Sequence, residues 1–554
     1  MAQFAPPSSE ERDLYYGGLP GGPELVARSS SNPWVNPQKP DSMWRGAIAN
    51  MYPKSFRPAK RDVLLHQQWN NAASSLRKQI LDAASVADWA AIDILSVGLG
   101  VGLKNEFHNT LLIAVAPGSM SWHQGHVLAL RCKAILEEHG IKDVHCEIRE
   151  STLTFGANAP EDAAADAPAD APTEDSGTPD SVLSGFQLLV SSEPITHIFY
   201  EKYHTDMSDK LGTKISMKDS DSTGNKGLYL ALSQPNARGE PRVVALTCRH
   251  HVLSPETEGL QEYRHQQSQP SKEVIQVPQP TYEESLERLP AVVTTYRRTA
   301  RSADQHSPDR AASYIERADK LESLGQYMER YKTPASRVFG HLLYSPELAC
   351  TSDNTNGAQW LRNWALIELL PNRHQSQLSA LKNKVFAGSL LSVLNTWRNA
   401  KVSSSATWPA LLVKRDVIWL EKTVVPMEEL FTPPDDADDP DEKALFVIKY
   451  DKLDGLTFGL GNTLKSIVRY TGIGGREFIS EEWCITSATR ANEHQMAFSS
   501  EGDSGLCILD AERRVAGILT AGCGINGINN VTYAQPVERL LADIRAHGYD
   551  VELV

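Results

Sequence analysis

Cysteine is scarce in this sequence, and no two cysteines form a CxxC pair. Seven cysteines among 554 residues is an odd number at scattered positions, which argues against a disulfide framework. Without CxxC pairs there is also no pattern typical of a zinc site. We therefore expect reduced thiols, no metal and no cofactor, in an intracellular and cytoplasmic protein. The cysteines are Cys132, Cys146, Cys248, Cys350, Cys484, Cys507 and Cys523.

Long apolar runs and positive charge are lacking too. No stretch of about 18 apolar residues is present, so we expect no transmembrane helix and no membrane partner. The first residues, MAQFAPPSSEERDLYYGG, show no basic region followed by an apolar core, which argues against a secretory signal. With a formal net charge of −14, the surface is a poor match for phosphate backbones, so nucleic acid is not an expected partner.

The N-terminal third divides into three parts by composition. Residues 1–59 are rich in Pro, Gly and Ser and are expected to be irregular. Residues 60–155 carry a helical pattern over 66–86, two apolar strand-like runs, a second helical pattern over 124–140 and a final alternating run. That order predicts a small α/β domain. Residues 156–182 are acidic and dominated by Ala, Pro and Asp, which predicts a disordered linker.

Beyond the linker the pattern changes to many short apolar runs separated by turn-forming residues. This pattern over residues 183–545 predicts an all-β sandwich or a pair of barrels. A helical pattern at about 282–332 interrupts it and predicts a helical insertion. An acidic stretch at about 432–443 predicts a solvated loop. The fold class expected for the whole chain is therefore multidomain α+β.

One short stretch, EGDSGLCILD, has the form of a site around an activated serine, Ser504. A serine hydroxyl needs a base to take its proton and donors to hold the oxyanion that forms. The glycine two places before the serine lets the backbone bend so that the N–H groups of Gly502 and Ser504 point into one hole. The alternative is a plain turn serine between two strands.

A candidate base follows an apolar strand in ALTCRHHVL, where two histidines stand side by side. The order of histidine, acid and serine along the chain is that of the chymotrypsin-like proteases. Residues 205–545 resemble the trypsin-like serine protease domain, and LTCRHHV is similar to the histidine motif of that family. Placing Thr247 on the hydroxyl residue of the motif puts His250 at the catalytic position. His251 remains the alternative.

Other segments carry the same resemblance. EGDSGLCILDAERRVAGILTAG is similar to the family's nucleophile segment, and VTYAQPVERLLADI is similar to its closing strand and C-terminal helix. KYDKLDGLTFG is similar to the strand pair that opens the second barrel in intracellular, HtrA-like members. The resemblance implies two perpendicular six-stranded barrels, with the site in the cleft between them.

The resemblance breaks at the acid of the triad. The stretch RNWALIEL matches the family's D-x-A-L, and the matching position is Asn363. An Asp there would hold the imidazole in the correct tautomer and stabilise the imidazolium, and the change of Asp to Asn costs about 10⁴ in turnover. Asp353 could substitute if its loop folds back, whereas alternation puts Glu368 on the opposite face.

Further family positions concern the substrate. Phe498, six positions before Ser504, matches the base of the pocket for the substrate side chain, although it could equally be a core residue. Thr520 and Gly522 match the wall of that pocket. In secreted members Asp503 would pair with a freshly cut N-terminus; here we expect a state set without zymogen cleavage.

Two functions from different classes follow. The first is a serine endopeptidase that hydrolyses a protein or peptide substrate, with Ser504 as nucleophile, His250 as base and Asn363 as a weakened orienting residue. The second is a catalytically silent pseudoprotease, a binding or signalling module whose N-terminal α/β domain recognises a protein partner.

Overall fold

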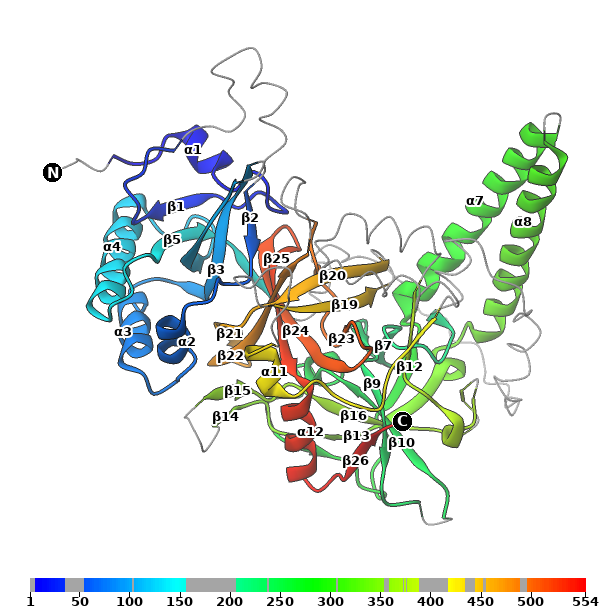
Figure 1. The fold of residues 1–554 in the computed structure, drawn as a ribbon. Helices are drawn as coiled ribbons and strands as arrows, with labels where there is room; N and C mark the ends of the chain where they lie inside the picture. The colour runs from blue at the N-terminus through cyan, green and yellow to red at the C-terminus, as the bar shows by residue number, and fades with distance from the viewer. Residues whose placement is uncertain are drawn as a thin grey trace.

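The computed structural model describes thirteen stretches of the chain (Figure 1). The expected linker 156–182 and Asp353 lie outside them, as does the acidic loop 432–443 except for its first two residues. Within the described part, no helix is long and apolar enough to cross a membrane. The described stretches are 5–34, 54–101, 104–155, 206–236, 239–304, 307–352, 358–371, 373–374, 376–387, 417–433, 444–451, 455–488 and 496–554.

The N-terminal unit contains the strand, strand, helix, strand order that the sequence predicts. Strands β3 (Trp89–Val101) and β4 (Lys104–Val115) form an antiparallel hairpin. Helix α4 (Trp122–Glu138), which begins at a capping box on Ser121, then carries the chain back. Strand β5 (His145–Glu150) can therefore pair with β4 in the parallel direction.

The described parts of residues 1–59, which are 5–34 and 54–59, contain regular elements that the composition did not predict. They contain helix α1 (Ser9–Leu14) and strands β1 (Leu25–Arg28) and β2 (Lys54–Arg57). Strand β1 pairs with β5 and β2 pairs with β3, both antiparallel. Such four-residue strands are stabilised by partners distant in sequence, so local composition does not reveal them.

The helical pattern over 66–86 corresponds to two helices, because the chain is capped twice. Helix α2 (Val63–Trp69) starts at Asp62, whose side chain accepts from the N–H of Leu65. Helix α3 (Ser75–Ala84) starts at Ser74 in the same way. With α4 they bury the apolar residues of β3, β4 and β5 in one core.

Six strands of the C-terminal part pair in a closed circuit. Each strand hydrogen-bonds to the next, and the last, β25, returns to pair with β22. Strand β21 (Ser466–Ile473) extends the circuit through a hairpin with β22. The strands of the circuit are β22 (Arg476–Ser487), β20 (Gly455–Gly461), β19 (Leu445–Asp451), β23 (Cys507–Asp510), β24 (Val515–Ile525) and β25 (Ile528–Pro536).

Residues 214–369 supply most of a second, nine-stranded sheet. A pair of long helices, α7 (Gln279–Asp304) and α8 (Pro308–Met328), leaves it between β12 and β13 and projects from the body (Figure 1). The sheet runs in the order β26 (Val551–Leu553), β9 (Leu228–Leu232), β10 (Arg242–Thr247), β16 (Ala365–Leu369), β13 (Val338–Ser345), β12 (Glu273–Gln276), β7 (Lys214–Met217) and β8 (Gly224–Asn225), with β11 (Tyr263–Arg264) beside β13.

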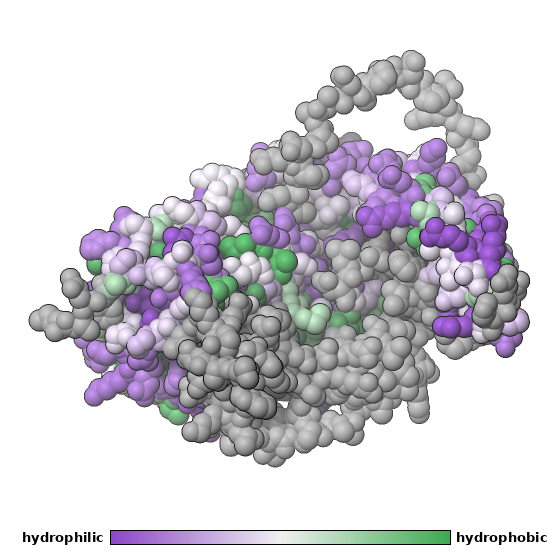
Figure 2. All heavy atoms as spheres, turned by 90° about the horizontal axis from the view of Figure 1, so that it is seen from above, coloured by the Kyte–Doolittle hydropathy of each residue, from purple (hydrophilic) through white to green (hydrophobic). Residues whose placement is uncertain are grey.

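The remaining elements are short and lie around the two sheets. The C-terminal helix α12 packs its apolar face into the core shared by both sheets. Seen from above, hydrophilic side chains cover most of the described surface, and hydrophobic ones gather toward its middle (Figure 2). These elements are α12 (Val537–Ala546), α11 (Met427–Phe431), the pair β14 (Cys350–Ser352) and β15 (Gln359–Leu361), and the pair β17 (Lys384–Phe386) and β18 (Val417–Trp419).

The N-terminal unit and the closed circuit share one sheet. Strand β3 pairs with β21 through Ile92 opposite Ile467 and Ala91 opposite Val468. One hydrophobic cluster likewise contains Leu95 from β3 and Tyr533 from β25. The linker therefore separates two stretches of sequence that the backbone hydrogen bonds hold together.

Asp93, on β3 of this shared sheet, has a fully buried carboxylate. It accepts hydrogen bonds from the hydroxyl groups of Ser466 (2.5 Å) and Tyr533 (3.1 Å), and the guanidinium of Arg149 lies 4.0 Å away. Burial raises the pKa of Asp93, although these three partners each oppose the rise. The network joins β3 and β5 of the N-terminal unit to β21 and β25.

We expect Asp93→Ala to lower the free energy of unfolding by about 3–5 kcal/mol, because it leaves the buried cation of Arg149 without its partner. Urea unfolding followed by circular dichroism measures this change. Asp88→Ala is the matched control, since Asp88 is 66% exposed in its pair with Arg469; its effect should stay within about 0.5 kcal/mol. Equal losses in the two variants would contradict the importance of the buried network.

Candidate active site

Ser504 lies in a tight turn immediately before β23. Gly502 and Gly505, on either side of the Asp503–Ser504 pair, have φ angles of 87° and 88°, which glycine adopts without strain. A Cβ atom added to Gly505 would also lie only 3.0 Å from the carbonyl oxygen of Asn225. The GDSG glycines are therefore required by backbone conformation and by close packing.

Two side chains from the nine-stranded sheet hold this turn. The Asn225 amide donates to the carbonyl oxygens of Gly502 (2.7 Å) and Ser504 (2.8 Å). The Lys214 ammonium also donates to Gly502 O (2.8 Å). Among the described residues, the N–H groups of Gly502 and Ser504 have no hydrogen-bond acceptor. The carbonyls are thus fixed while two N–H donors remain available beside Ser504.

His250 lies in a short 3-10 turn (Arg249–His251) that follows β10. Its Nε2 is 3.3 Å from Ser504 Oγ, and its Nδ1 is 3.1 Å from Asn363 Oδ1. All three side chains are buried. The structure therefore brings together the three residues that the sequence places in a triad, although they are separated by more than a hundred positions in each case.

His251 also contacts Ser504. Its Nε2 is 3.0 Å from Ser504 Oγ and 3.1 Å from the backbone oxygen of Ser504. A carbonyl oxygen only accepts, so this contact favours the His251 tautomer with its hydrogen on Nε2, in which that nitrogen cannot take the serine proton. Gly224 makes room for the ring, because a Cβ there would lie 2.3 Å from it. This geometry favours His250 over His251 as the base.

The amide of Asn363 faces two groups of His250. Its Oδ1 accepts from the backbone N–H of His250 (3.2 Å), which leaves the amide nitrogen as the nearer atom to Nδ1, at 2.8 Å. Donation from the amide to Nδ1 places the ring hydrogen on Nε2, toward Ser504. A carboxylate at this position would instead accept from both donors and leave Nε2 free.

No described carboxylate hydrogen-bonds to the His250 ring. Glu368 is engaged by the Arg242 guanidinium at 2.6 and 2.9 Å. Burial lowers the pKa of His250 to about 4, and the Asn363 amide oxygen, 3.1 Å from Nδ1, could oppose this only in part as an acceptor. The imidazole is therefore neutral at pH 7, because the negative charge of Glu256 favours its protonated form too weakly to offset burial.

A buried lysine pairs with Asp503. The Lys449 ammonium, from β19, lies 3.0 Å from Asp503 and 2.8 Å from Asp451. Burial alone would lower the pKa of Lys449, but the two carboxylates outweigh it and the pKa is raised. An internal cation thus stabilises the buried carboxylate next to Ser504.

The three residues assigned to the substrate pocket lie in different surroundings. Phe498 is 2% exposed and packs in a core cluster with Trp483, which is the packing role that was the alternative for it. Thr520 Oγ1 lies 3.3 Å from the carboxylate of Glu482, whose pKa burial raises to about 7. Gly522 lies in β24 opposite Thr154 of the N-terminal unit.

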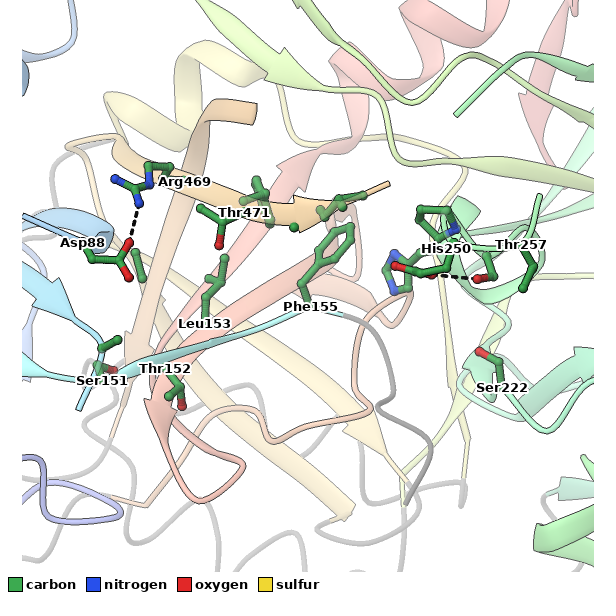
Figure 3. Close-up of a pocket in the computed structure, with 18 of the residues that line it drawn as sticks. Asp88, Ser151, Thr152, Leu153, Phe155, Ser222, His250, Thr257, Arg469 and Thr471 are labelled. Atoms are coloured by element: carbon green, nitrogen blue, oxygen red, sulfur yellow. Dashed lines mark hydrogen bonds and ion pairs between the residues drawn. The ribbon is translucent and has the colours of Figure 1, made fainter. Parts of the chain in front are cut away.

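A cleft of about 780 Å³ opens beside His250 (Figure 3). One wall comes from residues 254–257, which follow the 3-10 turn of His250, and another comes from the N-terminal unit, including Phe155. The Phe155 ring lies beside the His250 ring in Figure 3, with 4.5 Å between their centroids. The contribution of the N-terminal unit to this site was not foreseen from the sequence.

Cys248, His250 and His251 are the described residues that could hold a metal ion, since one ligand atom from each lies within 4.8 Å of the others. Burial raises the pKa of the Cys248 thiol, which disfavours the thiolate that a metal needs. Zinc ligands lie about 2.0–2.3 Å from the metal, so these donors would have to move closer together.

Comparisons with known proteins give matches among solved structures alone. No family model matches the chain, and no curated protein matches it. Among solved structures, the chain is similar to a glutamic-acid-specific serine protease described as using a histidine triad in substrate binding. The match has a TM-score of 0.25 and 10% sequence identity, and it covers 62% of this chain and 99% of the other.

Sequence reasoning missed three residues that hold the nucleophile turn, namely Lys214, Asn225 and Lys449. Lys449 had a detectable signal, because it interrupts the apolar run LFVIKYD two residues before an aspartate. A lysine in a buried strand implies a buried carboxylate partner. Asn225 and Lys214 had no such signal, since the carbonyls that they bind are distant in sequence.

We expect Lys449→Met to destabilise the protein by about 3–5 kcal/mol at pH 7, because the buried carboxylates of Asp451 and Asp503 would lose the ammonium that contacts both of them. The pKa of Asp503, which burial already raises, would then lie further above its unfolded value, so the variant should regain stability as the pH falls. Thermal unfolding at pH 7 and pH 5 tests both statements. Lys218→Met, at a surface pair with Glu273, is the control and should change little at either pH. A loss at pH 5 as large as at pH 7 would be inconsistent with this account.

Proposed function

We propose that this chain is a serine endopeptidase-like protein with a trypsin-like fold, in which the closed circuit and the nine-stranded sheet correspond to the two barrels. The observation that carries the proposal is the contact of Ser504 Oγ with His250 Nε2, made beside the open N–H groups of Gly502 and Ser504. The substrate class is an extended peptide or protein segment.

The proposed reaction follows from these positions. His250 Nε2 takes the proton of Ser504 as its oxygen attacks the substrate carbonyl carbon. The N–H groups of Gly502 and Ser504 hold the oxyanion, and His250 then gives its proton to the leaving amine. Water repeats the sequence on the acyl-enzyme and restores Ser504.

Asn363 weakens this machinery in two ways. Its amide nitrogen, 2.8 Å from His250 Nδ1, favours the tautomer with hydrogen on Nε2, so part of the population cannot accept the serine proton. It also lacks the charge that would stabilise the imidazolium. The proposed enzyme is therefore slow.

The contact of the Asn363 amide with His250 also supports the second candidate, a silent pseudoprotease that binds a protein or peptide without turnover. In this case the Ser504 turn and the cleft beside His250 act as a binding surface, to which the N-terminal unit contributes one wall. The two candidates differ in whether Ser504 is nucleophilic.

A fluorophosphonate probe, which reacts only with an activated serine, distinguishes them. We expect slow labelling of the native protein, none of Ser504→Ala or His250→Ala, and labelling of Asn363→Asp faster by up to about 10³–10⁴-fold. The carboxylate accepts both donors of His250, which accounts for the gain.

His251→Gln is the matched control for the choice of base. It should retain labelling within about tenfold, because Gln keeps a donor for the Ser504 carbonyl. Labelling lost in His251→Gln but kept in His250→Ala would reverse the assignment of the base. No labelling of either the native protein or Asn363→Asp would refute the enzyme and leave the binding module.

The pH dependence of labelling provides a separate test. Only neutral His250 can accept a proton, so the rate in the native protein should fall as the pH drops through about 4. In Asn363→Asp the new negative charge favours the imidazolium, and the midpoint should rise by about one to three pH units. An acidic limb at the same pH in both forms would show that the titrating group is not His250.

A further inference from the structure

Along one edge of strand β24, only the first half of the strand pairs with β23. Residues Cys507–Leu509 of β23 pair with Val515, Gly517 and Ile518, whereas β25 pairs along the whole opposite edge. On the β23 side, the second half of β24 would present unpaired backbone groups next to the Ser504 turn. Such an edge accepts an extended peptide as an added antiparallel strand.

In this molecule the edge is occupied by the chain itself. Strand β6 (Thr152–Thr154) pairs antiparallel with β24, with Thr154 opposite Gly522 and Thr152 opposite Gly524. The hydroxyl of Thr152 donates to Gly524 O (3.0 Å), and that of Thr154 lies 3.1 Å from Gly522 O.

The residue after β6 reaches the catalytic histidine candidate. The Phe155 ring contacts the His250 ring at 4.5 Å and the Tyr470 ring at 4.9 Å between centroids. In Figure 3 the strand runs from Ser151 through Leu153 and brings Phe155 to His250. A peptide approaching Ser504 along β24 would need the same space.

We propose that the edge of β24 at Gly522–Gly524 docks an extended peptide with a hydroxyl residue opposite Gly522 and an aromatic residue next to it, and that Ser151–Phe155 occupies this edge as an internal inhibitory strand. The identification of this edge as the substrate edge rests on the proposed function. The occupation of the edge by β6 does not.

Attachment to the N-terminal unit favours the internal strand over a free peptide. Strand β6 follows β5 directly, and Ser151 is held by Arg149 (3.2 Å) and by the backbone oxygen of Val115 (2.8 Å). Since β3 is paired with β21, the unit keeps β6 at a high local concentration beside β24. A substrate must therefore displace this segment before it can bind.

Binding of a fluorescein-labelled STLTF peptide, measured by fluorescence anisotropy, tests the proposal. Every form of the full chain carries Ser504→Ala, so that binding is read without turnover. The loosened form adds Thr152→Val, Thr154→Val and Phe155→Ala, which remove the hydroxyl bonds and the ring contact but retain strand-forming residues. We expect the loosened form to bind the peptide at least about tenfold more tightly.

Two controls test whether the tighter binding of STLTF by the loosened form comes from the freed edge of β24. A peptide ending in Ala, STLTA, should lose most of the gain, because it lacks the ring that faces His250. Leu130→Ala, on the exposed face of α4, should bind STLTF as the parent form does. Equal affinity of the parent and loosened forms, or no binding to either, would overturn the proposal.

Hydrogen exchange of the Ser504→Ala parent gives a result that does not depend on the loosened form folding. Excess STLTF should speed exchange in Leu153–Phe155 while Gly522–Gly524 stay protected. Unchanged exchange in Leu153–Phe155 at saturating peptide would also overturn the proposal. If the loosened form binds peptide but neither it nor Asn363→Asp is labelled when Ser504 is present, the docking edge stands and the enzyme does not.

Discussion

The antiparallel pairing of β3 with β21 is the constraint on which the rest of the structure depends. It joins a sheet built before the linker to the strands built after it, and the buried carboxylate of Asp93 reinforces the join. Because this pairing fixes the two halves relative to each other, the segment after β5 lies against β24 and pairs with it. The environment of His250 is consequently set by both halves of the chain.

Around Ser504, the residues that hold the turn differ from the residue that orients His250. The turn is held by Asn225 and by the pair of Lys449 with Asp503. The orientation of the histidine depends on one amide, Asn363, which satisfies the backbone N–H of His250 at the expense of the imidazole. The nucleophile turn is thus well formed, while proton transfer is the poorly supported step.

How much the sequence could reveal depended on the range of each interaction. The turn at Ser504 and the helix cap at Ser121 are local, and their residue types identify them directly. His250 and Asn363 were selected as partners for Ser504 because a family resemblance supplied the long-range alignment. The pairing of β6 with β24 had no local signal, since Thr152–Thr154 is a three-residue strand beside a linker-like composition, and its partner lies hundreds of positions away. For Phe498, a motif position suggested a pocket, and its burial is compatible with core packing as well.

The shared sheet has a consequence for the covalent continuity of the chain. Backbone pairing, a common hydrophobic cluster and the Asp93 network join the two halves without using any residue between 156 and 205. A single cut in that stretch would yield two fragments on a denaturing gel but one particle in gel filtration. The molecule would then behave as a non-covalent heterodimer whose smaller subunit ends close to the active-site candidate.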